Sequence, residues 1–308
     1  MPASAPQRNQ LEYFLVDVFT DTPLKGNPLA VVMNTCNLST GQMQAIAREF
    51  NLSETTFVER RSPEVERDEG VRVRVFTTQE ELPFAGHPTL GTASVLLENA
   101  PETAQEGTVK LALNVGPVPV RFAPDDGNGW FGEMKQPEPR FGAELNPAEV
   151  APLLGLAAGD LDPRLEPQVV STGSPFAIVL LRSVEALGRL KVDQEKATAW
   201  LRRCGARWFY VLAPSPVQKQ GAGQPYQARM QFYNGEDPAT GSAAGCAISY
   251  LVAHGLVKSD ERVRVRQGVE IGRPSELFLT AKMDSAKVSD VRVAGRTVLV
   301  AKGQFFQP

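Results

Sequence analysis

Two short segments of the chain repeat one pattern, and this repeat limits the possible folds more than any other feature of the sequence. Residues 87–93 (HPTLGTA) and 237–243 (DPATGSA) align without gaps as polar residue, proline, two variable positions, glycine, hydroxyl residue and alanine. The stretch after each segment is almost wholly apolar, which is typical of a helix enclosed by other structure. The repeat predicts two related lobes, each built around a buried helix. Chance agreement over seven positions rich in small residues is the alternative.

The second segment also has the features of a helix start. An aspartate side chain can cap free backbone amides, and proline, which has no N–H, is favoured at the first helical position. We therefore expect a helix that begins at Pro238, directly after Asp237, and ends near Gly255. The small residues at its start would let another backbone segment or a ligand come close.

The length of the chain agrees with two lobes. Its 308 residues are enough for about two domains, and its 42% hydrophobic and 22% charged residues are ordinary for a globular protein. Proline-rich residues 135–147 are the best candidate linker. We therefore expect an N-terminal lobe over residues 1–140 and a C-terminal lobe over residues 141–308, and leave open whether the last strands cross back to the N-terminal lobe.

The charge balance and the first residues exclude several classes of partner. The chain has 32 basic and 35 acidic residues, a formal net charge of −3, and no basic stretch interleaved with aromatic residues. Nucleic acid is therefore not an expected partner. The first ten residues are polar and contain proline, without the apolar core of a signal peptide or a membrane segment. The sequence thus predicts a cytoplasmic protein with no membrane association.

Residues that commonly bind metals or form disulfides are sparse. Cys36, Cys204 and Cys246 are an odd number at wide spacing, so we expect reduced, buried thiols. No pair of cysteines has metal-ligand spacing, and only His87 and His254 could supply imidazole ligands. The sequence also lacks a nucleotide-binding signature. It predicts a protein without a metal and without an organic cofactor.

The rest of the chain has the patterns of many strands and few helices, which favours an α+β fold over a βαβ nucleotide fold. Ser39 and Gln42 form a capping box, apolar residues follow at helical spacing over residues 40–50, and Asn51 is a suitable left-handed stop. Glu54 follows at the start of a strand, beside the C-terminal end of that helix. The other expected elements are strands near 11–19, 29–33, 72–77, 108–122, 129–134, 167–172, 176–182, 207–213, 227–233, 262–266, 276–282, 287–293 and 296–302, a helix near 193–203 and an exposed loop at 214–225.

Three motifs, in this order, resemble those of the PhzF-like phenazine biosynthesis proteins. They are residues 51–55 (NLSET), 84–91 (FAGHPTLG) and 236–243 (EDPATGSA), and the segments VDVFT, GNPLAVV, QG and GRP extend the resemblance over nearly the whole chain. The resemblance implies the diaminopimelate epimerase-like fold. In that fold two pseudosymmetric lobes each consist of a strongly curved, mostly antiparallel sheet wrapped round a buried central helix. The site would lie in the cleft between the lobes, and a homodimer is the common assembly.

The resemblance also implies a reaction. The named phenazine enzyme isomerises trans-2,3-dihydro-3-hydroxyanthranilate without a cofactor, by moving a proton between ring carbons. Glu54 would be the acid/base, and His87 and Asp237 would assist proton movement. Related epimerases use two cysteines, but Ala85 and Asp237 stand at those positions here, which excludes two-thiol epimerisation. The further substrate-binding residues would be Ser53, Gly86, Gly241 and Ser242.

Elementary chemistry agrees with these roles. A base that removes a carbon-bound proton needs a pKa near the working pH, and burial or a helix C-terminus raises the pKa of a carboxylate. Two helix starts that face one cleft would offer free amides to the carboxylate of a small substrate. We therefore expect the three motifs to converge on one interlobe cleft. The plainer alternatives are a solvated Glu54, an Asp237 that only caps a helix and a His87 that only fills a turn.

Three functions fit these residues. The first is a cofactor-independent isomerase that acts on a small carboxylic acid through Glu54. The second is a racemase or epimerase with Glu54 and Asp237 as opposed acid and base. The third is a non-catalytic small-molecule-binding protein of the same fold, against which the presence of all three motifs counts. The sequence does not identify the substrate.

Overall fold

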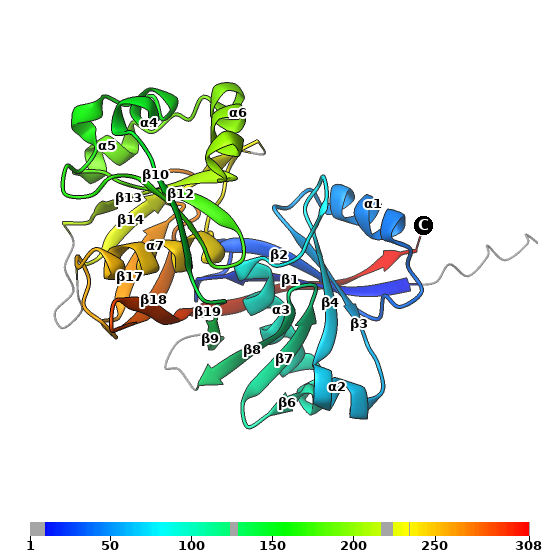
Figure 1. Ribbon diagram of the computed structural model, residues 1–308. Coiled ribbons are helices and arrows are strands. Elements are labelled where there is room, and N and C mark those ends of the chain that lie inside the picture. Colours follow the sequence, from blue (N-terminus) through cyan, green and yellow to red (C-terminus); the bar gives the residue numbers. More distant parts are fainter. Residues whose placement is uncertain (1–9, 124–128, 217–223, 234, 308) are drawn as a thin grey trace, which may run out of the picture.

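Two groups of strands, each around one long helix, make up the molecule. The computed structural model describes residues 10–123, 129–216, 224–233 and 235–307. The enclosed helices are α3 (Gly86–Asn99) and α7 (Gly241–Ala253), and Figure 1 shows them in two lobes that are joined by long strands. The architecture is α+β, as the sequence predicts.

In the first lobe, eight strands of the described residues close into a ring. Its order is β1–β2–β3–β4–β7–β8–β9–β19, and β19 pairs back with β1. The pairs β2–β3 and β4–β7 are parallel, and the others are antiparallel. The strands are β1 (Gln10–Val18), β2 (Asn27–Val32), β3 (Thr55–Glu59), β4 (Val71–Phe76), β7 (Thr108–Leu113), β8 (Gly116–Ala123), β9 (Trp130–Lys135) and β19 (Lys287–Phe306), with short β5 (Glu81–Leu82) and β6 (Ala104–Gln105) at its margin.

The second lobe is a sheet that ends on the same strand β19. Its order is β10–β11–β12–β13–β14–β17–β18–β19, with parallel pairs at β12–β13 and β14–β17. The strands are β10 (Arg140–Glu144), β11 (Gln168–Ser171), β12 (Pro175–Leu180), β13 (Trp208–Pro214), β14 (Tyr226–Arg229), β17 (Val263–Gln267) and β18 (Ser275–Asp284), and a separate short hairpin joins β15 (Gln231–Phe232) and β16 (Gly235–Glu236).

The two lobes repeat one order of strand pairing. From β1 to β9, and again from β11 to β19, successive pairs are antiparallel, parallel, antiparallel, parallel, antiparallel and antiparallel. In both series the enclosed helix follows the fourth strand, so α3 and α7 occupy equivalent places. The repeated sequence segments therefore belong to a repeated structure, and the lobes are pseudosymmetric.

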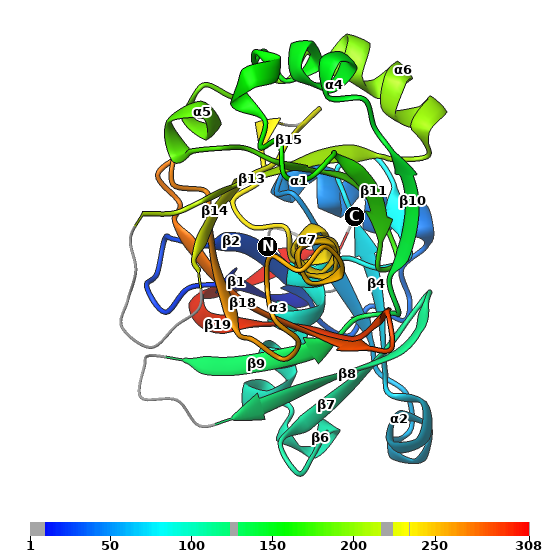
Figure 2. The same ribbon diagram turned by 60° about the vertical axis from the view of Figure 1, so that its left-hand side comes forward.

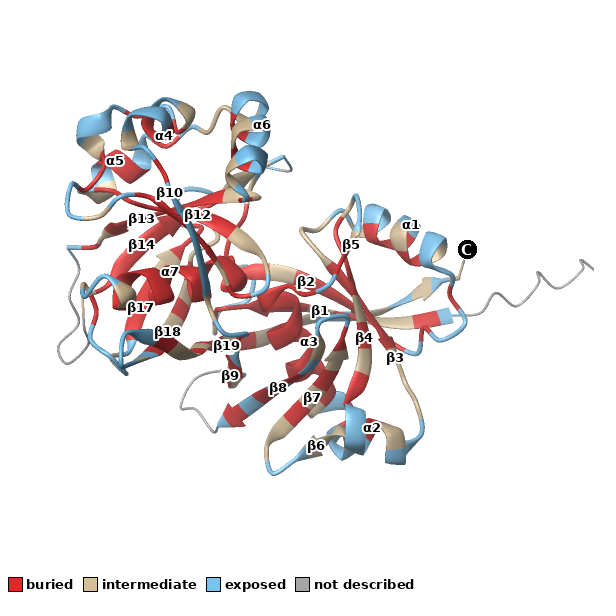
Figure 3. Ribbon diagram, viewed as in Figure 1, coloured by how far each residue is buried: buried red, intermediate tan, exposed pale blue. Residues whose placement is uncertain are grey.

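The two central helices are covered on all sides. Every residue of α7 from Gly241 to Val252 is buried, and so is every residue of α3 from Gly86 to Leu96. Figure 2 looks nearly along α7 and shows strands around it, and Figure 3 shows both helices in the colour of buried residues. No side of either helix needs polar residues, which explains their apolar sequences. Among the described residues no helix is long and apolar enough to cross a membrane.

The remaining helices lie on the outside of the sheets. Figure 3 shows exposed residues along α1 and α6, and α6 packs on the outer face of the second lobe with α4. These outer helices are α1 (Thr40–Phe50), α2 (Pro63–Glu69), α4 (Pro147–Leu153), α5 (Val184–Gly188) and α6 (Gln194–Cys204), with 3₁₀ turns η1 (Pro101–Thr103) and η2 (Ala158–Asp160). The sequence analysis did not predict α2, α4 or α5, which are short and lack a clear apolar period.

The first outer helix is confirmed in detail. Helix α1 begins at Thr40 and ends at Phe50, and both hydrogen bonds of the Ser39–Gln42 capping box are present. Asn51 closes it in the left-handed region, at φ +50°. Glu54 thus lies in the short connection between the end of α1 and the start of β3.

Several local expectations are wrong. Residues 135–147 do not form a plain linker, because they contain β10, which pairs with β11. The two strands expected at 287–293 and 296–302 are the single strand β19, whose first part pairs with β18 and β9 and whose last part pairs with β1. Cys36 is exposed and Cys204 half-buried, so only Cys246 is a buried thiol. Residues 217–223 of the expected loop lie outside the described residues.

We predict that Gly86→Ala destabilises the fold. A Cβ atom at Gly86 would lie 2.7 Å from the backbone nitrogen of Ser242 and 2.8 Å from the carbonyl carbon of Gly241. Backbone atoms cannot swing away, so the two helix starts would have to move apart, at a cost of about 1–3 kcal/mol. Thermal unfolding should show a lower Tm.

Gly188→Ala is the matched control, because no atom lies within 4 Å of a Cβ at that position. Its Tm should match the wild type or exceed it slightly. Equal Tm values for wild type and Gly86→Ala would show that this contact does not hold the lobes together.

Candidate functional site

A cleft lined by both lobes contains most of the residues that the sequence singles out. Its empty volume is about 480 Å³, part of it open to solvent. Ser53, Glu54, Asp237 and Ser242 line it directly. The other lining residues are Thr77, Leu82, Phe84 and Ala85 from the first lobe and Ser174, Phe176, Arg207, Trp208, Met230, Phe232, Tyr233 and Thr240 from the second.

Glu54 lies between α1 and β3, and its side chain is only 16% exposed. Burial, the larger cause, and the neighbouring Asp237 carboxylate raise the pKa of Glu54 well above its ordinary value, whereas the positive charge of Arg207 lowers it. Glu54 therefore holds a proton more readily than a solvated glutamate does, which suits an acid/base catalyst.

His87 is the second residue of α3 and is buried. Burial lowers its pKa to about 3, so the ring is neutral at neutral pH. Its Nδ1 lies 3.2 Å from Nδ2 of Asn27, which also donates to Oδ1 of Asp237 and to the Ala239 carbonyl. A neutral ring with its hydrogen on Nε2 avoids placing two donors face to face there. That Nε2 lies 3.5 Å from Oε2 of Glu54. Because the ring is uncharged, this contact is not a salt bridge.

The Asp237 carboxylate is held by donors from both lobes. Its Oδ1 accepts from Nδ2 of Asn27 at 2.7 Å, and its Oδ2 accepts from Oγ1 of Thr240 at 2.6 Å. The Ser53 side chain and the Ala239 amide also donate to it. These bonds lower its pKa, but burial outweighs them and raises the pKa to about 6. Asp237 can therefore exist in either protonation state near neutral pH.

The helix expected to begin at Pro238 begins at Gly241 instead. The reason is Gln267 on β17, whose Nε2 donates to the Asp237 carbonyl at 2.8 Å and whose Oε1 accepts from the Thr240 amide at 3.1 Å. A side chain therefore binds the backbone groups that helical hydrogen bonds would otherwise use. Asp237 lies in a braced turn ahead of the helix and is not its N-cap residue, which is Thr240.

The starts of α3 and α7 meet at the floor of the cleft. Gly86 packs against the backbone of Gly241 and Ser242. Neither N-cap residue, Ala85 or Thr240, accepts a hydrogen bond from the first amides of its helix on its side chain. The first amides of both helices are thus left for another acceptor, and the positive ends of both helix dipoles lie close together. The arrangement can hold an anionic group such as a carboxylate.

All seven sequence-predicted site residues are thus brought together, and their roles in binding and catalysis stay predictions. The sequence analysis missed three further residues, namely Asn27, Gln267 and Arg207. Asn27, in the GNPLAVV segment, is the first residue of β2 and joins His87 to Asp237. A polar residue at the start of a buried strand is the signal that could have found it. Gln267 lies in the QG segment of the family resemblance, and Arg207 directly precedes the buried strand β13, as Glu54 precedes β3.

Unpartnered polar atoms gather at this cleft. Among the described residues five buried side-chain atoms lack a hydrogen-bond partner, and three of them belong to the Glu54–His87–Asn27 group: Glu54 Oε2, His87 Nε2 and Asn27 Oδ1. The other two belong to Thr55 and Arg61. A buried polar atom without a partner is costly and uncommon. Such a cluster is typical of a place where a ligand completes the hydrogen bonds.

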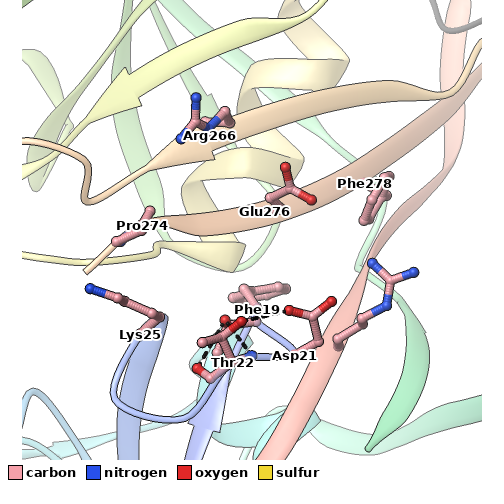
Figure 4. Close-up of a pocket in the computed structure, with 10 residues that line it drawn as sticks. Phe19, Asp21, Thr22, Lys25, Arg266, Pro274, Glu276 and Phe278 are labelled. Atoms are coloured by element: carbon pink, nitrogen blue, oxygen red, sulfur yellow. Dashed lines mark hydrogen bonds between the residues drawn. The ribbon is translucent and has the colours of Figure 1, made fainter. Parts of the chain in front are cut away.

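A larger cavity, with an empty volume of about 600 Å³, lies elsewhere and lacks this property. In Figure 4 Asp21 and Lys25, from the loop after β1, face Glu276 of β18 across it. Lys25 already donates to the Gly272 carbonyl at 3.2 Å, and Glu276 pairs with Arg264 at 3.1 Å. None of the five unpartnered atoms of the described residues belongs to its lining. The interlobe cleft is therefore the stronger candidate site.

The residues that could ligate a metal are not clustered. In the part of the chain that the structure describes, no three histidine, cysteine, aspartate or glutamate side chains come together in a way that could hold a metal ion.

Comparisons with known proteins point to one family. A family model described as phenazine biosynthesis-like protein matches residues 16–303. An uncharacterized isomerase of Mesorhizobium japonicum is 38% identical, over 96% of this chain and 98% of that protein. The trans-2,3-dihydro-3-hydroxyanthranilate isomerase of Pseudomonas aeruginosa is 37% identical, over 96% of this chain and 99% of that protein. Among solved structures, a PhzF-family phenazine biosynthesis protein of Bacillus anthracis superposes with a TM-score of 0.83 at 25% identity, over 96% and 99% of the two chains.

We predict that Asp237 makes stability depend on pH. Its folded-state pKa of about 6 lies above the ordinary value of 3.8, so the folded chain binds this proton more tightly than the unfolded chain. The wild type should therefore lose stability as the pH rises from about 4 to about 6, by up to about 3 kcal/mol. Asp237→Asn removes this titration, so the variant should gain stability relative to wild type between pH 4 and pH 8 in urea denaturation.

Asp68→Asn is the control, since Asp68 is exposed on α2. It makes the same chemical change on the surface and should not reproduce the gain expected for Asp237→Asn. A stability difference for Asp237→Asn that stays flat with pH would contradict the raised pKa.

Proposed function

We propose that this chain, which belongs to the phenazine biosynthesis-like protein family, moves a proton between carbon atoms of a small carboxylic acid with Glu54 as acid and base. The observation that carries the proposal is the pair of buried, unpartnered atoms Glu54 Oε2 and His87 Nε2, which lie 3.5 Å apart at the cleft. An acid/base group must leave its reacting oxygen free for the substrate, and Glu54 does so. The proposed reaction needs no cofactor.

The class of enzyme follows from the relatives. The two relatives described above are both named isomerases, and each matches nearly the whole chain. The chain is therefore an isomerase. The substrate is a separate question, because the identity to the trans-2,3-dihydro-3-hydroxyanthranilate isomerase, 37%, hardly differs from the 38% to the uncharacterized one. We propose a substrate that resembles trans-2,3-dihydro-3-hydroxyanthranilate in being a small carboxylic acid with an acidic C–H bond.

The proton would travel through Glu54. In its ionised form the Glu54 carboxylate accepts a proton from one carbon of the substrate, and the electron pair of the C–H bond moves into the substrate. The same carboxyl group then returns the proton to a second carbon, which restores the base. Because burial raises the pKa of Glu54, its carboxylate is a stronger base toward the substrate proton than a solvated glutamate is.

The groups around Glu54 would orient the substrate. The neutral His87 ring can donate Nε2–H to a substrate oxygen or nitrogen, and Asn27 fixes this tautomer through Nδ1. The uncapped starts of α3 and α7 offer amides to the substrate carboxylate, and Gly86 and Gly241 let the two helix starts come close together. Ser53 and Ser242 line the same cleft. The substrate would thus be held on its polar groups while its C–H bond faces Glu54.

A racemase or epimerase is the second candidate. The observation in its favour is that Asp237, with a pKa raised to about 6, is a second acid in the same cleft that could deliver a proton near neutral pH. That reaction would return the proton to the same carbon from the other face and so invert it. A non-catalytic binding protein is the third candidate, and it has no need of an unpartnered buried carboxylate.

We further propose, on the family resemblance, that the enzyme is a cytoplasmic homodimer that acts on small molecules and binds neither nucleic acid nor membranes. Size-exclusion chromatography with light scattering tests the dimer. An elution at the monomer mass of 33.4 kDa would contradict it.

We predict that Glu54→Gln abolishes catalysis and leaves the fold and ligand affinity nearly intact. The amide keeps the shape of the side chain but cannot accept a carbon-bound proton, so kcat should fall by ~10² or more with little change in KM. The measurement is turnover of trans-2,3-dihydro-3-hydroxyanthranilate in D₂O, followed by deuterium incorporation. If that compound is inert, deuterium exchange into a panel of small carboxylic acids replaces it.

Glu49→Gln is the matched control, because it makes the same chemical change at an exposed position on α1. It should retain wild-type turnover. Full activity in Glu54→Gln would remove Glu54 from the mechanism. Deuterium incorporation with inversion of one carbon would favour the epimerase, and an inert wild type that still binds these acids would favour the binding protein.

A further inference from the structure

Arg207 occupies the place in the second lobe that Glu54 occupies in the first. Each lies one residue before the strand that pairs in parallel with its neighbour, β3 or β13. Each also follows a helix that is closed by a left-handed residue, Asn51 at φ +50° or Gly205 at φ +77°. The internal repeat therefore directs a cation from one lobe and an acid from the other toward the same cleft, which both residues line.

The guanidinium of Arg207 is fixed by contacts on two sides. One nitrogen, Nη2, pairs with Oε1 of Glu80, which lies in the first lobe between β4 and β5. The guanidinium also stacks on the Trp208 ring, 4.3 Å from its centroid. Close by, Tyr233 of the second lobe bonds to Thr77 of the first. These contacts cross from lobe to lobe at the mouth of the cleft.

The charges of the cleft are unbalanced without Arg207. Among the described residues that line the cleft, Glu54 and Asp237 are the carboxylates and Arg207 is the only cation. His87 beside them is neutral, so it offers no compensating charge. A carboxylate substrate would bring one more negative charge into the same space. A nearby positive charge therefore favours both an ionised Glu54 and an anionic ligand.

We propose that Arg207 is a positioning residue for Glu54: it supplies the positive charge that balances the carboxylates of the cleft, and through Glu80 it holds the mouth of the cleft together. The inference rests on the proposed function, because it assigns to Arg207 a role in the reaction of Glu54. It goes beyond that function in naming a residue outside the three motifs and in separating a charge effect from a contact effect.

The two effects predict different results for different variants. Arg207→Gln removes both the charge and the contact to Glu80. Glu80→Gln weakens the contact and leaves the charge. Arg207→Lys keeps the positive charge but loses the planar guanidinium group, with its several N–H donors and its stacking on Trp208. Arg202→Gln, at an exposed position in the last turn of α6, removes an arginine far from this network and is the matched control.

The experiment measures the pKa of Glu54 directly, by ¹³C NMR of protein labelled at the glutamate carboxyl carbons. Glu54→Gln identifies the signal. The groups that face Glu54 are Asp237 ahead of α7, His87 on α3, Tyr233 after β15 and Arg207 ahead of β13, and only the last is changed in the key variant. Because Arg207 lowers the Glu54 pKa, Arg207→Gln should raise it by ~0.5 unit or more.

The other variants should separate the effects. Arg207→Lys should restore a Glu54 pKa close to that of wild type, and Glu80→Gln and Arg202→Gln should not raise it. In the deuterium-exchange assay, the acidic limb of the kcat profile should move to higher pH in Arg207→Gln by the same amount as the NMR pKa, and a lower kcat at neutral pH should follow. KM for the anionic substrate should rise in Arg207→Gln more than in Arg207→Lys.

An unchanged Glu54 pKa in Arg207→Gln overturns the proposal. Equal losses of activity in Arg207→Gln and Glu80→Gln without a pKa shift would also overturn it, because they would make Arg207 a purely structural link between the lobes. The NMR measurement does not depend on turnover. A wild type that shows no exchange with any carboxylic acid would therefore count against the proposed reaction, whereas the titration would still decide whether Arg207 acts on Glu54.

Discussion

The close contact between the starts of α3 and α7 is the constraint on which the rest of the site depends. Two helix N-termini would normally repel each other, because each carries a partial positive charge. Here they meet backbone to backbone at Gly86, where a side chain would not fit, and Gly241, where it would be tightly packed. The nearby carboxylates of Glu54 and Asp237 offset this charge, and a bound anion would offset it further. The positive charge of the two helix starts therefore affects both the packing of the fold and the binding of anions in the cleft.

Burial decides how the acids of the cleft behave. Asp237 receives bonds from Asn27, Thr240, Ser53 and a backbone amide, and its pKa is still raised, to about 6. Those bonds satisfy Asp237 as an acceptor and fix its position, whereas Oε2 of Glu54 has no partner. The two carboxylates thus differ in their hydrogen bonds: Asp237 is fixed by several donors, whereas Glu54 has an oxygen without a partner. This difference favours Glu54 over Asp237 as the group that reacts with a carbon-bound proton.

Much of this could be predicted from the sequence, for physical reasons that operate locally. The Ser39–Gln42 capping box and Asn51 determine α1, and the apolar runs after the repeated segments determine the enclosed helices. The turn at Asp237 could not be predicted, because Gln267, thirty residues away in the chain, competes for its backbone groups. Asn27 was likewise missed, because its contacts to His87 and Asp237 join segments 60 and 210 residues apart. Local patterns contain no information about such distant partners.

The repeat itself explains why the site is asymmetric. The lobes share one order of strand pairing, so residues at equivalent positions of the two lobes lie at the same cleft. Glu54 is equivalent to Arg207, and His87 is equivalent to Asp237. A symmetric set of side chains would place equal acids on both faces, as two-base racemisation requires. In this chain one pair is an acid and a cation, and the other is a neutral imidazole and a carboxylic acid that is partly protonated near neutral pH. A single free base on one face can remove a proton and return it on that same face, so the asymmetry of the repeat favours a proton shift over an inversion.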